Sequence, residues 1–325
     1  MSSTWVQPSN HTLYRRSGRT GLHLPMLSLG LGRGRHRTPI ALPSLVRKAL
    51  ELGINSFDIT APYRRSHEFY AEVRSAFSAC QPKREEFFVS VRIGLGTGPL
   101  PFAGYSSRRQ LLAGVDGLLR DTALDYVDIL YLHRLDPQTP LTEATTALAD
   151  AIRLGKALYP GLSAFSGRAL TEANAVLTSH GTPAAALQVS YSLMDRWAEE
   201  GLLDTLAIQG IGGVACAPMA HGQLTTGRKR GRFMPGSKAR TIETLTQLAA
   251  ARGQTLEQLA ISWALRDQRI SSALLTTTDH SHLAAVCEAV HHTDFTAEEL
   301  VAFDACCPIP AFTIPSVSDK RAVHE

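Results

Sequence analysis

A short apolar segment followed by an amphipathic one recurs about eight times along this chain of 325 residues. Apolar, β-branched runs of this length are typical of buried strands, and the apolar spacing after each run predicts a helix. Parallel strands joined by right-handed crossover helices are the fold that such a pattern favours. Eight units in a chain of this length predict a closed (β/α)8 TIM barrel.

The expected elements follow one another closely. We expect strands near residues 26–32, 54–60, 86–92, 125–133, 157–163, 185–192, 212–219 and 271–277. We expect helices near residues 43–53, 67–79, 107–119, 142–154, 167–180, 198–210, 239–253 and 280–290. Two short segments within residues 11–30, with turn residues from Gly18 to Gly21, predict an amino-terminal β-hairpin.

An open, doubly wound sheet is the alternative fold. The glycine-rich stretches "LGLGRG" and "GLGTGP" follow strands, but neither matches the G-x-G-x-x-G or the phosphate-loop spacing. No low-complexity segment or linker divides the chain. We therefore expect one barrel domain over residues 1–325, with a tail from about residue 305 to 325.

Composition narrows the classes of function. The chain is 44% hydrophobic and 19% charged, and it contains no apolar run of the roughly 18 residues that a membrane helix needs. It starts without the apolar core of a signal peptide, so we expect a cytoplasmic protein with five reduced cysteines. Two basic clusters, at residues 33–37 and 227–232, lack interleaved aromatic residues and predict solvated loops rather than a nucleic-acid interface.

Polar residues stand where the predicted strands end. In a TIM barrel the carboxyl ends of the strands carry the chemistry, because the loops there converge on one face. Those ends carry Asp58, Arg92, His133, Ser163, Gln188 and Cys216, with Tyr63 in the loop after Asp58. The first three belong to neighbouring strands, which predicts one shared site.

The chain resembles the aldo-keto reductase superfamily, within the branch of bacterial glyceraldehyde 3-phosphate reductases and potassium-channel β subunits. The resemblance rests on "LSLGLG", "ALELGINSFDITAPY", "LQVSYSLMDRW", "APMAHGQLTTG" and a long match from "LLRDTALDYVDILYLHRLD" to "LYPGLSAFS". It implies reduction of carbonyl compounds with NADPH by a tetrad of Asp, Tyr, Lys and His. By motif these are Asp58, Tyr63 and His133, and Arg92 stands at the lysine position.

Arginine changes the chemistry that the resemblance implies at this position. Tyrosine, with a free pKa of about 10, is a weak proton donor unless a cation stabilises its phenolate. Arg92, held by Asp58, could supply that field to Tyr63. Its guanidinium is planar and permanently protonated, so it cannot easily relay a proton as lysine does.

The cofactor positions also depart from the family. The resemblance implies that Ser163 and Gln188 hold the nicotinamide carboxamide, while the third contact, Asn or Ser in the family, is Ala164. Cys216 replaces the aromatic residue that stacks on the nicotinamide.

The adenosine end departs further. Asp279 replaces the arginine for the adenosine 2′-phosphate, and His282 and Val286 replace the glutamine and asparagine near the adenine. NADPH should therefore bind weakly. Either Asp279 accepts hydrogen bonds from a ribose 2′-hydroxyl and NADH is preferred, or no nicotinamide cofactor is bound. Thr278 or Asp279 is also the expected N-cap of the helix that follows, and no metal site is expected.

Three functions stay open at this point. The first is a nicotinamide-dependent reductase of small aldehydes or ketones, with Tyr63 as proton donor and His133 orienting the carbonyl. The second is a cofactor-independent isomerase, dehydratase or lyase that uses Tyr63 and His133 as acid and base. The third is a non-catalytic binding or regulatory subunit. The expected partner is a small carbonyl compound, and a homo-oligomer is left open.

Overall fold

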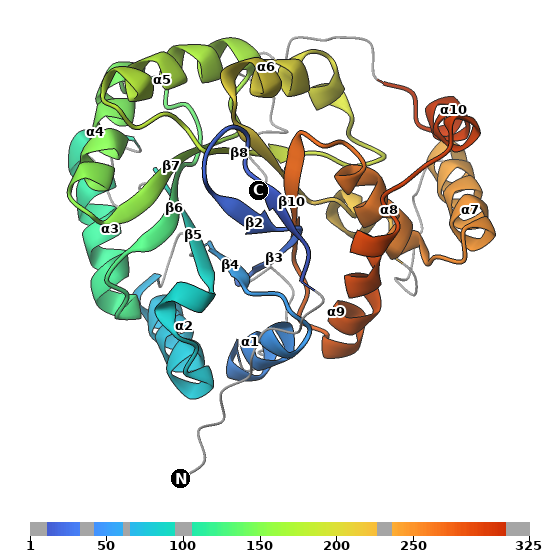
Figure 1. Cartoon of the computed structure of the whole chain (residues 1–325), viewed down its shortest axis with the longest axis horizontal. Coiled ribbons are helices and arrows are strands. Elements are labelled where there is room, and N and C mark those ends of the chain that lie inside the picture. Colours follow the sequence, from blue (N-terminus) through green and yellow to red (C-terminus); the bar gives the residue numbers. More distant parts are fainter. Residues whose placement is uncertain (1–11, 33–41, 61–65, 95–105, 226–235, 310–325) are drawn as a thin grey trace.

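The barrel predicted from the sequence is present in the computed structural model, which describes residues 12–32, 42–60, 66–94, 106–225 and 236–309. Within these residues eight parallel strands close a ring in the order β10-β3-β4-β5-β6-β7-β8-β9 (Figure 1). The strands are β3 (Leu27–Gly30), β4 (Ser56–Ile59), β5 (Phe88–Ile93), β6 (Val127–Leu132), β7 (Ala157–Ser163), β8 (Ala186–Ser190), β9 (Gly212–Cys216) and β10 (Ile270–Leu275). The chain is therefore a (β/α)8 TIM barrel.

Helices cover the outside of the ring, as Figure 1 shows. They are α1 (Leu42–Glu51), α2 (Ser66–Cys80), α3 (Arg108–Thr122), α4 (Leu141–Arg153), α5 (Gly167–Ser179), α6 (Leu202–Gln209), α7 (Gly236–Ala251), α8 (Leu256–Leu265), α9 (His280–Cys287) and α10 (Ala297–Cys306). Single 3-10 turns are η1 (Arg84–Glu86), η2 (Trp197–Glu199), η3 (Ala220–Gly222) and η4 (Glu288–His291).

Helix α8 is absent from the set of helices expected from the sequence. All its residues except Gln258 are buried, so it shows no alternation of apolar and polar faces. Its start is fixed by a capping box, in which the side chains of Thr255 and Gln258 each bond the other's backbone amide. A helix buried on every side lacks the amphipathic period that reveals a surface helix.

The expected hairpin closes one end of the barrel. Strands β1 (Tyr14–Arg16) and β2 (His23–Pro25) pair antiparallel and cross the ring in Figure 1. The Ser17 hydroxyl donates to the Ala185 carbonyl oxygen at 2.7 Å. Gly18 has φ +54°, and a Cβ there would lie 2.1 Å from the Gly210 carbonyl oxygen, so a side chain is excluded. The hairpin is thus joined to the amino-terminal ends of the strands.

The barrel interior is filled by its own apolar cluster. The cluster comprises Leu22, Leu24, Ile129, Tyr131, Ala185, Ala186, Val214, Cys216 and Leu274. Tyr131 is 1% exposed, and a Cβ on Gly161 would lie 2.4 Å from its ring. Only glycine at position 161 leaves room for this tyrosine, which forms the floor beneath the polar strand ends.

Three predictions fall wholly or partly on residues outside the described ranges. They are the role of Tyr63, the two basic clusters at residues 33–37 and 227–232, and the tail from about residue 305, of which residues 310–325 lie outside. Among the described residues no helix has both the length and the apolar character needed to cross a membrane.

Candidate active site

Asp58 is the centre of the polar cluster at the carboxyl end of the barrel. It lies on β4 and is 1% exposed. Its Oδ2 accepts hydrogen bonds from the Ser90 hydroxyl at 2.8 Å and from Gln188 Nε2 at 2.7 Å, and its Oδ1 accepts from the Thr60 hydroxyl at 2.8 Å. β4 and β8 are opposite in the ring, so the bond from Gln188 crosses the barrel. Asp58 is therefore a buried carboxylate held on three sides.

Arg92 lies beside Asp58 on the neighbouring strand β5. Its Nη2 is 3.5 Å from Asp58 Oδ1, and the side chain is 14% exposed. Its Nη2 and Nε also donate to the Thr60 hydroxyl oxygen at 2.6 and 3.2 Å. Because that hydroxyl in turn donates to Asp58, Thr60 bridges the ion pair. The permanent cation is thereby fixed at the mouth of the barrel.

His133 follows β6 at the same end of the barrel. Its backbone amide donates to the Ile93 carbonyl oxygen at 2.9 Å, and the residue is 7% exposed. Burial, followed by the positive charges of Arg92 and Arg134, lowers the pKa of His133 to about 3, against the opposing effect of Asp58. Its Nδ1 is buried and has no hydrogen-bond partner among the described residues. His133 is thus a neutral imidazole at neutral pH.

A neutral imidazole limits what His133 can do. It can donate or accept a hydrogen bond, but an imidazolium with a pKa near 3 is not populated at pH 7. For the same reason the ring is a weak general base, because base catalysis is most effective when the pKa lies near the working pH. The side chain is therefore suited to orienting a polar ligand atom.

Tyr131 lies directly beneath these residues. Burial, with the nearby charges of Asp58 and Cys216, raises its pKa well above the usual value for tyrosine, and Arg92 opposes the shift. The phenol therefore stays protonated at neutral pH. Its register partners are Arg92 on β5 and Gly161 on β7, so it supports the floor of the site.

The residues expected at the nicotinamide lie on the other side of the mouth. Ser163 and Gln188 are buried and are register partners on β7 and β8. Gln188 Oε1 is buried without a hydrogen-bond partner in the described part of the chain, so this amide has unused acceptor capacity. Cys216 ends β9 and is 7% exposed, within the apolar floor. Ala164 takes φ 58°, a conformation that asparagine adopts more readily than alanine.

Asp279 is the N-cap of α9, one of the two caps, Thr278 or Asp279, that the sequence predicts. Its Oδ1 accepts from the Ser281 amide at 2.8 Å and the His282 amide at 3.3 Å. The hydrogen bond from the Ser281 hydroxyl, with those backbone bonds, holds the pKa of Asp279 below its usual value. The amides at the start of this helix, which are the usual partners of a phosphate, are therefore already bonded to a carboxylate.

These contacts can be compared with what each end of the expected nicotinamide cofactor, the carboxamide and the adenosine, would require. At the carboxamide end, Ser163 and the free Oε1 of Gln188 suit a nicotinamide. Of the residues expected near the adenosine, Asp279 caps the helix start, and Val286 is 1% exposed within the core. That end does not suit a 2′-phosphate, because a carboxylate repels it. No group of three or more His, Cys, Asp or Glu side chains in the described ranges could hold a metal ion.

The structure brings together Asp58, Arg92, His133 and Gln188, with Ser163 beside Gln188. Tyr63 cannot be placed because it lies outside the described residues. Sequence reasoning did not identify Thr60, Ser90 or Tyr131 as members of the site. Each lies two residues from a predicted site residue. In an extended strand, side chains two residues apart point to the same face. That alternation is the signal that could have found them.

Comparisons with known proteins identify the family. A model of the aldo/keto reductase family matches residues 30–308. An L-glyceraldehyde 3-phosphate reductase of Escherichia coli O157:H7 is 35% identical over 318 residues, which cover 90% of this chain and 91% of the relative. A putative voltage-gated potassium channel subunit beta of Schizosaccharomyces pombe is 27% identical over 327 residues, covering 92% and 94%. Both belong to the branch that the sequence resembles, and the chain is a member of the aldo/keto reductase family.

Proposed function

We propose that the chain reduces a small aldehyde or ketone with a nicotinamide cofactor, and that it prefers NADH to NADPH. The observation that carries the proposal is the Asp58–Arg92 pair beside a neutral His133 at the carboxyl end of the barrel. Reduction of a carbonyl develops negative charge on its oxygen, and a fixed cation with a hydrogen-bond donor stabilises that charge. The bound nicotinamide would supply the hydride.

The residues of the chain divide the remaining work. His133, as a neutral imidazole, orients the carbonyl oxygen through a ring N–H. Arg92 supplies the positive field, and Asp58 holds Arg92 through the ion pair and through Thr60. Tyr63, expected from its motif, donates the proton to the alkoxide oxygen. The positive charge of Arg92 lowers the free energy of the Tyr63 phenolate that remains after this proton transfer.

The preference for NADH is supported by Asp279. Its carboxylate caps α9, where it would face the adenosine ribose. A carboxylate can accept hydrogen bonds from a ribose 2′-hydroxyl, whereas it repels a 2′-phosphate. Ser163 and Gln188 would bind the carboxamide at the opposite end.

The cofactor-independent reading is less favoured by the electrostatics of the site. It requires His133 to act as acid or base, and burial beside Arg92 lowers the pKa of His133 to about 3. The non-catalytic reading gives no role to the buried ion pair of Asp58 and Arg92. A Tyr63→Phe variant separates it from the reductase, because a binding subunit would keep its function and a reductase would lose turnover.

Turnover with a panel of small carbonyl compounds tests the proposal. The panel should include L-glyceraldehyde 3-phosphate, the compound in the name of the Escherichia coli relatives, and each compound should be tried with NADH and NADPH. We expect NADH oxidation that depends on the carbonyl compound. Asp58→Asn should lower kcat by at least about 100-fold, the scale of a lost catalytic group.

Asp116→Asn is the matched control for that variant. Asp116 is a half-exposed carboxylate on α3, one of the helices outside the ring of strands, and it pairs with Lys156. Its turnover should match the wild-type protein. Equal turnover in Asp58→Asn and Asp116→Asn would contradict the proposed site, and so would the absence of turnover with every carbonyl compound in the panel.

A further inference from the structure

Two adjacent cysteines lie where α10 ends, on a helix outside the ring of strands (Figure 1). Cys306 is the last residue of the helix and Cys307 is its C-cap. Their Sγ atoms are 3.8 Å apart, within hydrogen-bond distance for sulfur. Cys307 is buried, whereas Cys306 is partly exposed and can be reached by a small molecule. The pair therefore combines one accessible thiol with one protected thiol.

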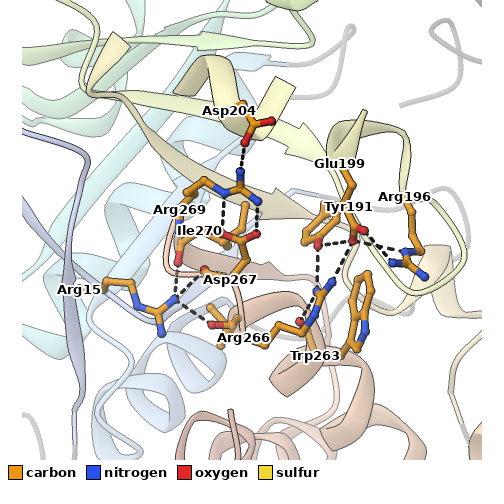
Figure 2. Close-up of polar contacts among 11 residues, drawn as sticks. Arg15, Tyr191, Arg196, Glu199, Asp204, Trp263, Arg266, Asp267, Arg269 and Ile270 are labelled. Carbon is orange, nitrogen blue, oxygen red and sulfur yellow. Dashed lines mark hydrogen bonds and ion pairs between the residues drawn. The ribbon is translucent and has the colours of Figure 1, made fainter. Parts of the chain in front are cut away.

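The backbone around these cysteines is held by other elements. Arg196 Nη1 donates to the Cys307 carbonyl oxygen and to Asp304 Oδ1, each at 2.7 Å. The Thr241 hydroxyl of α7 donates to the Cys306 carbonyl oxygen at 3.4 Å. Figure 2 shows Arg196 at one edge of a larger network, where it also bonds Glu199. The end of α10 is thus fixed beside a buried cation.

This environment makes the two thiols unequal. The hydrogen bond with Cys307, with help from the charge of Arg196, lowers the pKa of Cys306 to about 7 against the effect of burial. The same hydrogen bond and burial raise the pKa of Cys307. The thiolate is the reactive form of cysteine, so Cys306 is the nucleophile of the pair at neutral pH. By contrast, burial raises the pKa of Cys287 to about 11.

We propose that Cys306 and Cys307 form an oxidisable vicinal dithiol, a modification site at which a hydroperoxide closes a disulfide between the two neighbouring residues. The Cys306 thiolate attacks a peroxide oxygen, so an S–O bond forms, the O–O bond breaks, and the leaving oxygen departs as water or an alcohol with a proton from solvent. Cys306 is then a sulfenic acid.

The second step uses the protected thiol. The Cys307 sulfur attacks the Cys306 sulfur, so the S–S bond forms and the S–O bond breaks, and the hydroxyl leaves as water with the Cys307 proton. Two thiol hydrogens and two electrons pass to the peroxide in total. Adjacent Cα atoms are about 3.8 Å apart, closer than in most disulfides, so the product is strained and readily reduced again. The modification is therefore reversible.

Mass spectrometry of the full chain tests the proposal. The reduced protein is treated with hydrogen peroxide at pH 7, the remaining thiols are alkylated, and the peptides are mapped. We expect a loss of about 2 Da, placed within the peptide that holds both cysteines, and its reversal by dithiothreitol. Cys307→Ser should stop at a sulfenic acid that dimedone traps at Cys306, because the second step has lost its nucleophile.

Two further variants separate this site from general oxidation. Cys306→Ser should show no loss of 2 Da, and the matched control Cys287→Ser should oxidise as the wild-type protein does. Alkylation of both thiols after peroxide treatment would overturn the proposal. A disulfide that joins two chains, or an equal mass loss in Cys306→Ser, would overturn it as well. None of these outcomes depends on carbonyl reduction, so the proposal stands apart from the proposed function.

Discussion

The barrel mouth and the network around Arg196 both bury arginines beside carboxylates, yet they satisfy their polar atoms differently. In the network Glu199 accepts from Arg196, Tyr191 and Arg266, and the Trp263 ring lies 3.7 Å from the Arg266 guanidinium carbon (Figure 2). None of the buried side-chain nitrogens and oxygens of these residues lacks a partner within the described chain. At the mouth, His133 Nδ1 and Gln188 Oε1 lack one.

This difference in hydrogen bonding distinguishes a network that stabilises the fold from a site that can bind a ligand. A fully bonded buried network rigidifies the fold, and it has no atom left for a ligand. The bonds from Arg196 and Tyr191 and the charge of Arg266 hold the pKa of Glu199 below its usual value in spite of burial. Buried polar atoms without partners cost stability, so the two at the mouth, His133 Nδ1 and Gln188 Oε1, are candidates for ligand contacts.

The largest effect on stability should come from Glu199→Gln. The substitution removes the carboxylate that faces both arginines and leaves buried Arg196 and partly buried Arg266 without their shared partner. Breaking a buried pair in this way costs about 3 to 5 kcal/mol of unfolding free energy. Chemical denaturation measures it. Glu172→Gln, in the exposed pair with Arg168, is the control and should change stability by less than about 1 kcal/mol.

At the mouth we expect a large loss of activity and a smaller loss of stability. Asp58→Asn should lower turnover by at least about 100-fold, or about 2.7 kcal/mol of transition-state free energy. Its cost in stability should be below that of Glu199→Gln, because Arg92 keeps its bonds to Thr60 and faces the open end of the barrel. If Asp58→Asn destabilised the fold more than Glu199→Gln did, the contrast between the two regions would be lost.

His133 should give the mouth a pH dependence of stability. Its folded pKa is about 3 and its usual value is 6.5, so between these pH values only the unfolded chain binds the proton. Stability therefore falls as the pH falls from about 6.5 to 3, by up to about 1.4 kcal/mol per pH unit from this residue, and the contribution is absent above pH 6.5.

The variant His133→Gln should remove that part of the slope. Unfolding midpoints between pH 4 and pH 7 would show it, as a flatter line than that of the wild-type protein. His291→Gln replaces an exposed histidine and should follow the wild-type line. A wild-type slope that His133→Gln leaves unchanged would mean that the imidazole is not held neutral by burial.

The smallest effect is expected at Asp279. Asn also caps helices well, so Asp279→Asn removes the charge and keeps the start of α9. Because the carboxylate is exposed, its repulsion is screened, and we expect NADPH to bind more tightly by less than about tenfold. NADH binding should be unchanged or slightly weaker. Equal changes in the affinity for both cofactors in a fluorescence titration would contradict a contact between Asp279 and the 2′ position of the ribose.

The barrel itself could be predicted from the sequence, because the fold depends on a pattern repeated about eight times. The positions of Asp58, Arg92 and His133 followed from the strand ends, and the cap at Asp279 followed from its residue type at a helix start. These features depend on residues close together in the sequence.

Other features depend on partners far apart in the sequence. The bond from Gln188 to Asp58 joins residues 130 positions apart on opposite strands, so the sequence predicted Gln188 only as a cofactor contact. Helix α8 was missed because burial on all sides removes its period. The low pKa of His133 depends on burial and on Arg92 of another strand, which composition and motif do not contain.

Direct binding of NADH to the purified chain tests the central claim, that the barrel mouth is a nicotinamide-dependent carbonyl site. The titration follows nicotinamide fluorescence, with NADPH measured alongside. We predict micromolar binding of NADH and weaker binding of NADPH, because the proposal places the Asp279 carboxylate at the start of α9 beside the 2′ position of the ribose. No binding of either cofactor at millimolar concentration would contradict the claim.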